Sequence, residues 1–163
     1  MMRVLYPGSF DPITKGHMNI IKQATQIFDE VIIAVLQNPI KKNSFFVLEE
    51  RLEILNKLYG NNSQVKLIAS TNTATDLALE YKCKAIIRGI RNIKDFEYEK
   101  QLAQINKDIS NDKVNTICLF ADQGLQTVSS SVVKEIFYLN KNISKYVDPI
   151  VEEKIILKGK KEK

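Results

Sequence analysis

The stretch that decides the fold is Tyr6-Pro7-Gly8-Ser9-Phe10-Asp11-Pro12-Ile13-Thr14-Lys15-Gly16-His17. It follows a short apolar run that begins at Arg3, and it leads into apolar residues spaced as on a helix, from Met18 to Phe28. The pattern predicts a strand, a turn-rich loop and a helix in direct succession. Because the first turn of a helix has unpaired N–H groups and a partial positive charge, we expect a phosphate-binding site here.

Four more short, apolar segments rich in Val and Ile follow, and each has the pattern of a strand. They cover residues 30–36, 65–68, 85–87 and 116–120. Helical patterns lie between and after them, over 47–60, 74–81 and 93–109, from Ser129, and from the N-cap and proline pair Asp148-Pro149. This alternation predicts one doubly wound, Rossmann-like α/β domain with a five-stranded parallel sheet and ligands at the carboxyl ends of its strands.

The charge of the chain is concentrated at its end. The 163 residues carry a formal net charge of +5, and Lys158, Lys160, Lys161 and Lys163 crowd the last six positions. We therefore expect one domain over residues 1–157 and a solvated basic tail over 158–163. The other basic residues form no dense stripe interleaved with aromatics, which argues against a nucleic-acid partner.

The composition also argues against a membrane or secreted protein. The longest apolar run, residues 31–36, is too short to cross a bilayer, and no apolar segment precedes the first turn. Cys83 and Cys118 stand far apart without a Cys-x-x-Cys motif, so we expect reduced cysteines in a cytoplasmic protein and no zinc site.

Three loops at the carboxyl ends of predicted strands contain the residues best suited to catalysis or to phosphate binding. They hold Ser9, Phe10 and His17; Arg88, Gly89 and Arg91; and Ser129, Ser130 and Ser131. Taken singly, each residue has an ordinary structural role, such as capping a helix. Gathered at one edge of a sheet, a hydroxyl, an imidazole, two guanidiniums and a serine run suit a substrate with several phosphates.

The common nucleotide-binding motifs are absent. The chain has neither Gly-x-x-x-x-Gly-Lys-[Ser/Thr] nor Gly-x-Gly-x-x-Gly, which excludes a P-loop enzyme and disfavours a dinucleotide-dependent one. His17 is the only histidine, so it is also the only candidate for imidazole chemistry.

The motifs together resemble the bacterial phosphopantetheine adenylyltransferases of the nucleotidyltransferase superfamily. The resemblance rests on residues 7–12, 14–17, 87–91, 95–99 and 129–135, in the family's order and spacing. It implies a nucleotidyltransferase domain that moves the adenylyl group of ATP to 4′-phosphopantetheine, giving dephospho-coenzyme A and pyrophosphate with Mg²⁺. It also implies a homohexamer and feedback by coenzyme A.

The resemblance further implies a role for each matching residue. His17, Lys41 and Arg91 would be catalytic, with Lys42 as an alternative to Lys41. The phosphopantetheine site would contain Ser9, Lys41, Ala74 and Arg88. The ATP site would contain Ser9, Phe10, His17, Gly89, Ile90, Arg91, Glu99, Leu125, Gln126, Thr127, Val128, Ser129, Ser130 and Ser131. No residue would be a dedicated metal ligand, so Mg²⁺ would be bound mainly by the triphosphate.

One segment departs from the family pattern. Family members commonly carry an aromatic residue near position 125 and a phenylalanine near 127, where this chain has Leu125 and Thr127. This departure favours the second of two other functions that stay open. One is adenylyl transfer to another acceptor, such as nicotinamide mononucleotide, and the other is nucleotide binding without turnover.

Overall fold

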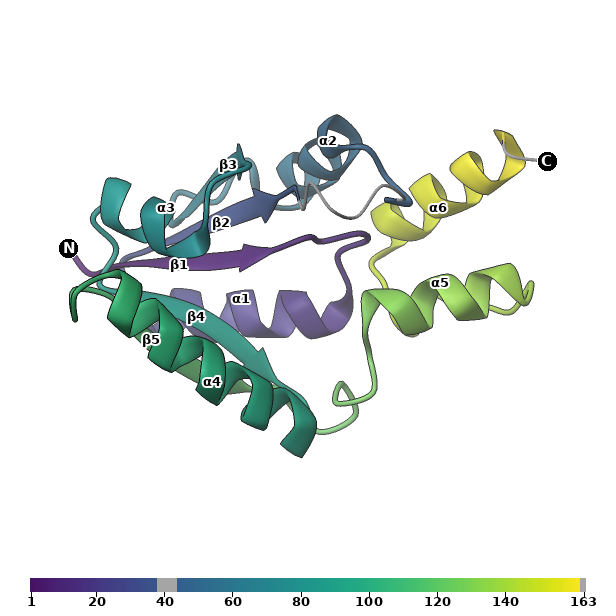
Figure 1. Cartoon of the computed structure of the whole chain (residues 1–163). Helices are drawn as coiled ribbons and strands as arrows, with labels where there is room; N and C mark the ends of the chain where they lie inside the picture. Colours follow the sequence, from purple (N-terminus) through teal and green to yellow (C-terminus); the bar gives the residue numbers. More distant parts are fainter. Residues whose placement is uncertain (38–43, 162–163) are drawn as a thin grey trace.

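The computed structural model describes residues 1–37 and 44–161. Five parallel strands form one sheet in the order β3-β2-β1-β4-β5, as Figure 1 shows. The strands are β1 Arg3–Gly8, β2 Glu30–Leu36, β3 Val65–Ser70, β4 Ala85–Ile90 and β5 Asn115–Phe120. The predicted fold class is confirmed, and the strands that begin at residues 3, 65 and 85 run two to three residues further than expected.

The central strands are apolar because both of their faces are buried. The five inner residues of β2 are all buried, and so are residues 4–7 of β1. The outer strands β3 and β5 are only partly covered, and their sequences are accordingly more polar. This difference fixes which strands lie in the middle of the sheet.

Helices cover both faces of the sheet (Figure 1). On one face, α1 Lys15–Ile27 and α2 Leu48–Tyr59 pack with the larger apolar core, which includes Val31, Ile33 and Ile87. On the other face lie α3 Ala74–Glu80 and α4 Ile93–Ile109. Among the described helices, none is both long and apolar enough to cross a membrane.

Two further helices, α5 Ser130–Tyr138 and α6 Pro149–Lys161, lie beyond the carboxyl ends of the strands. Both starts agree with the expected capping residues, since Ser129 caps α5 and Asp148 accepts a hydrogen bond from the N–H of Ile150. The predicted boundary at residue 157 falls inside α6. Lys158 forms an ion pair with Glu50 of α2 and lies over the ring of Phe46, so this residue is packed rather than solvated.

The strand order creates a crevice between β1 and β4. These two strands pair only at Val4 with Ala85 and Leu5 with Ile86, whereas β1 stays paired with β2 as far as Gly8. Successive connections leave the sheet in opposite directions at this point, which is where doubly wound sheets bind their ligands. The separation of β1 from β4 thus opens the sheet at the level of the first loop.

Candidate functional site

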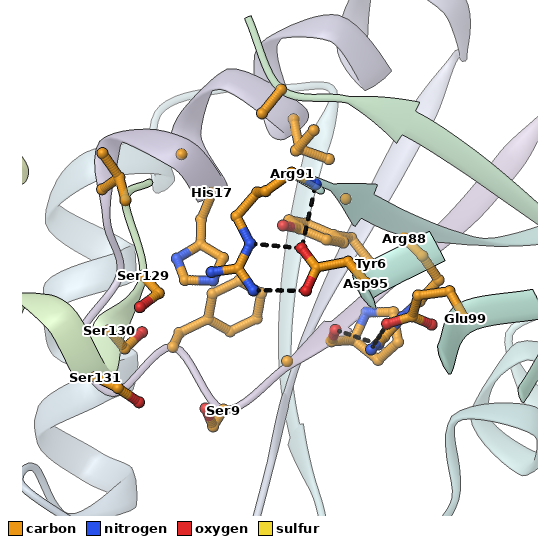
Figure 2. A pocket seen from close by; sticks show the side chains of 18 residues that line it. Tyr6, Ser9, His17, Arg88, Arg91, Asp95, Glu99, Ser129, Ser130 and Ser131 are labelled. Atoms are coloured by element: carbon orange, nitrogen blue, oxygen red, sulfur yellow. Dashed lines mark hydrogen bonds and ion pairs between the residues drawn. The ribbon is translucent and has the colours of Figure 1, made fainter. Parts of the chain in front are cut away.

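A cavity of about 310 Å³ occupies the crevice at the carboxyl ends of β1 and β4. It is lined by the end of β1 and the first loop (residues 9–14), by the start of α1, by β4 and α4, and by the start of α5. Figure 2 shows Ser9, His17, both arginines and the three serines around this one space. The structure therefore brings together the three loops that the sequence singled out.

The first loop is held by buried contacts. The Asp11 carboxylate accepts hydrogen bonds from the backbone N–H groups of Phe45 (2.8 Å) and Phe46 (2.7 Å), and Lys134 of α5 lies 3.5 Å from it. Phe10 adopts a left-handed backbone with φ of 47°, and its ring covers Gly8 so closely that a Cβ there would lie 2.9 Å from it. Packing on this scale keeps the loop in a single conformation.

His17 occupies the third position of α1, and its ring orientation is fixed by Thr14. The backbone N–H of Thr14 donates to Nδ1 of His17 at 3.1 Å, and Oγ1 of Thr14 lies 3.0 Å from the same nitrogen. Because Nδ1 accepts a hydrogen bond, the neutral ring carries its proton on Nε2. Thr14 thus leaves the Nε2–H of His17 as the group available to a ligand.

The protonation state of His17 agrees with this donor role. Burial, followed by the positive charges of Arg91 and Arg88, lowers the pKa of His17 to about 4. The ring packs edge-on against Phe10, with 5.3 Å between the ring centroids. At neutral pH His17 is therefore a neutral hydrogen-bond donor.

Both arginines of the cavity are paired with carboxylates of α4 (Figure 2). Nε and Nη2 of Arg91 donate to Asp95 at 2.8 and 3.1 Å. Nε and Nη2 of Arg88 donate to Glu99 at 2.7 and 2.6 Å, and Nη1 reaches the carbonyl oxygen of Pro7 at 3.3 Å. Asp95 and Glu99 are four residues apart, so one helix face supplies both partners. The two pairs hold the arginines in position and offset part of their charge.

The serine run caps α5 and ties it to the first loop. The hydroxyl of Ser129 accepts a hydrogen bond from the N–H of Val132 at 3.2 Å, and the hydroxyl of Ser130 donates to the carbonyl oxygen of Pro12 at 2.8 Å. The amino-terminal turns of α1 and α5 therefore border the same cavity. Each helix start carries a partial positive charge, so the two helices add positive potential to the cavity.

Most of the predicted site residues line the cavity. They are Ser9, Phe10, His17, Arg88, Gly89, Arg91, Glu99, Val128, Ser129, Ser130 and Ser131. Leu125, Gln126 and Thr127 belong to the adjoining turn and do not line it, and Ile90 is buried in the core. Ala74 starts α3 and packs against the core cluster on that face of the sheet. Lys41 and Lys42 lie outside the described residues.

Tyr6, Ile20 and Asp95 also line the cavity, although the sequence pattern predicted no site role for them. Tyr6 is the last large apolar side chain of its strand, and Asp95 follows Arg91 by one helical turn, so spacing alone could have indicated both. Burial raises the pKa of the Tyr6 hydroxyl, which therefore stays protonated.

Solved structures with a similar fold include the following two. A putative nicotinate-nucleotide adenylyltransferase from Vibrio parahaemolyticus superposes with a TM-score of 0.62 at 18% identity, covering 96% of this chain and 99% of its own. A lipopolysaccharide core biosynthesis protein from Thermoplasma volcanium superposes with a TM-score of 0.58 at 20% identity, covering 76% of this chain and 99% of its own. At these identities the likeness shows the fold alone.

Sequence comparisons are more specific. The profile of the cytidylyltransferase-like family matches residues 5–136. The phosphopantetheine adenylyltransferase of Finegoldia magna is 45% identical, covering 93% of this chain and 93% of its own. The enzymes of the same name from Geobacter metallireducens and Bacteroides thetaiotaomicron are 42% and 37% identical, over 91% and 90% of this chain and 90% and 95% of their own. The chain therefore belongs to the cytidylyltransferase-like family and, within it, to the phosphopantetheine adenylyltransferases.

Proposed function

We propose that the protein transfers the adenylyl group of ATP to 4′-phosphopantetheine and releases pyrophosphate, forming dephospho-coenzyme A in coenzyme A biosynthesis. The observation that carries the proposal is the neutral His17 donor, set between two helix starts and two arginines in one cavity. Similarity to three phosphopantetheine adenylyltransferases over at least 90% of the chain supports this choice of acceptor.

The reaction needs positioning more than acid–base chemistry. An oxygen of the acceptor phosphate is already a nucleophile, and it forms a bond to the α-phosphorus of ATP while the bond from that phosphorus to the pyrophosphate oxygen breaks. Negative charge on the α-phosphate oxygens must be stabilised as this happens. The Nε2–H of His17 is a preorganised donor for one of these oxygens, and it keeps its proton throughout.

The two arginines can contact phosphates without leaving their partners. Asp95 accepts from Nε and Nη2 of Arg91, so Nη1 keeps its N–H groups for an oxygen of ATP. Arg88 is held at the β1 side of the cavity by Pro7 and Glu99, and we assign it to the acceptor. We assign Arg91, Glu99 and the start of α5 to ATP, and Ser9 to both substrates. Lys41 and Ala74 stay predicted contacts of the acceptor.

The carboxylates of the cavity are not free to hold a metal ion. Asp95 and Glu99 are each engaged by an arginine, and within residues 1–37 and 44–161 no three His, Cys, Asp or Glu side chains form a possible metal cluster. Because these carboxylates are already paired, a Mg²⁺ ion would bind chiefly to the phosphates of ATP and would neutralise part of their charge.

We also infer a homohexamer with coenzyme A as a feedback ligand. The outer surface of α4 and β5 exposes large apolar side chains, including Ile93, Phe96, Ile109 and Phe120, which suits contact between copies. Coenzyme A contains the product of the proposed reaction and would compete for the same cavity. Light scattering tests the oligomer, and inhibition by coenzyme A tests the feedback. A cytoplasmic location stays a prediction.

A pyrophosphate-release assay tests the proposed reaction. The protein is incubated with ATP and Mg²⁺ and with 4′-phosphopantetheine, nicotinamide mononucleotide or no acceptor. We expect release only with 4′-phosphopantetheine. Release with the mononucleotide instead would identify a different adenylyltransferase, and ATP binding without release with either acceptor would indicate a nucleotide-binding module.

A further inference from the structure

Arg51 of α2 is a buried arginine directly behind the first loop. Only 3% of its surface is exposed, and its Nη1 donates to the carbonyl oxygen of Ser9 at 2.9 Å. Its Nε is buried without a hydrogen-bond partner in the structure. Arg51 thus lies behind a loop whose residues face the nucleotide cavity, and it contacts that loop through one hydrogen bond.

The charge of Arg51 is not matched by a carboxylate in the described part of the chain. The ion pairs found there, all with N···O distances of at most 4.0 Å, do not include Arg51. Asp11, in the same loop, accepts from two backbone N–H groups and is paired with Lys134. A buried cation without an anion is unfavourable, so its presence calls for a compensating negative charge.

Arg51 differs in this respect from the two arginines that line the cavity. Arg88 and Arg91 are each paired with a carboxylate of α4, while Arg51 has no such partner among the described residues and lies in a poorly hydrated place. Charges in such places act over longer distances than exposed ones, because water screens them less. A substrate phosphate at Ser9 would supply the missing negative charge.

We propose that Arg51 is a positioning residue of the nucleotide cavity. Its hydrogen bond fixes the carbonyl group of Ser9, and its uncancelled charge strengthens the binding of substrate phosphates at the first loop. The inference rests on the proposed function only in taking a phosphate-bearing molecule as the ligand. It does not depend on which acceptor the enzyme uses.

Three variants separate the charge of Arg51 from its structural contact. Arg51→Gln keeps a donor for the Ser9 carbonyl and removes the charge, whereas Arg51→Lys keeps the charge without the planar guanidinium. Lys57→Met removes one positive charge from the exposed end of the same helix and serves as the control. The probe is inorganic pyrophosphate, whose dissociation constant is measured by calorimetry at several NaCl concentrations on protein checked for its melting temperature.

We expect Arg51→Gln to weaken pyrophosphate binding about tenfold at low salt and to flatten its salt dependence. Arg51→Lys should stay within about threefold of the parent protein, as should Lys57→Met. The proposal is overturned if Arg51→Gln binds like Lys57→Met, or if Arg51→Lys binds as weakly as Arg51→Gln. Should Arg51→Gln fail to fold, Arg51→Lys decides by itself: a tenfold loss of affinity with the charge retained contradicts the proposal.

This binding test is independent of turnover. If the parent protein releases no pyrophosphate with ATP and 4′-phosphopantetheine, the proposed reaction fails, while the affinities of the Arg51 variants still decide the role of this residue. If turnover is found, Arg51→Gln should also raise the KM for ATP about tenfold, with the same salt dependence as pyrophosphate binding.

Discussion

The first loop and the turn over residues 121–128 border the same cavity, but they are built differently. In the first loop, Phe10, Asp11 and Thr14 are buried, and hydrogen bonds tie the loop to the segment before α2 and to α5. In the turn, Asp122, Gln126 and Thr127 are exposed, and Gly124 has a positive φ of 88°. The buried loop positions the reacting groups, whereas the exposed turn can vary in sequence, as it does here relative to the family pattern.

The largest effect should follow removal of the imidazole next to the first loop. His17→Ala should lower kcat by about 10² to 10³, because one preorganised donor to the α-phosphate is lost. The KM values should change much less, since the donor acts mainly in the transition state. Steady-state pyrophosphate release measures both constants. Turnover close to that of the parent protein would show that His17 has no role in the mechanism. It would also contradict the view that the first loop positions the reacting groups.

The next largest effect should appear in the pH dependence of folding, through His17 beside the first loop. The folded-state pKa of His17 is about 4, below its ordinary value of 6.5, so between these pH values the unfolded chain binds a proton that the folded chain does not. The contribution of neutral His17 to the free energy of unfolding is therefore fully present above pH 6.5. It should fall by up to about 3 kcal/mol as the pH drops toward 4.

Urea unfolding at several pH values checks this contribution. His17→Gln, which has no titrating group, should lose less stability on acidification than the parent protein. An equal loss in both proteins would show that other groups cause the acid sensitivity. Because His17 stays neutral, kcat should also show no inflection that depends on it between about pH 5 and 8.

Asp11 in the first loop and Asp122 in the turn can be compared directly. Asp11→Ala leaves two buried N–H groups, those of Phe45 and Phe46, without an acceptor and should lower the free energy of unfolding by about 2 kcal/mol. Asp122→Ala removes exposed hydrogen bonds to Asn19 and Gln23 and should cost less than about 1 kcal/mol. Urea unfolding measures both variants. Equal losses would mean that the first loop is no more firmly held than the turn.

The smallest effects should come from side chains at the exposed end of the turn. Gln126→Ala and Thr127→Ala should each change the KM for ATP by less than about threefold, because neither residue lines the cavity and surface substitutions have small effects. The assay is the same pyrophosphate release at varied ATP. A tenfold increase in KM would show that the turn closes over the nucleotide, as the predicted ATP site implies.

Much of the fold could be predicted because its signals are local. Continuous apolar runs identified the five strands, and the capping residues Ser129 and Asp148 marked helix starts to within one residue. The gathering of three loops in one cavity also followed, because parallel strands place their carboxyl ends at one edge of the sheet. The tail was misjudged at Lys158, since its partner Glu50 is far away in the chain.

The sequence by itself determined the succession of strands and helices along the chain, the family and most of the residues around the cavity. Only the tertiary structure decided how those residues are used: that Glu99 of α4 pairs with Arg88 of β4, and that Arg51 is buried behind Ser9 without a carboxylate partner among the described residues. The physical reason is that strand and helix patterns depend on neighbouring residues and on burial, which periodicity records. The contacts of Arg88 and Arg51 depend on which separate segments pack together, and no local pattern contains that information.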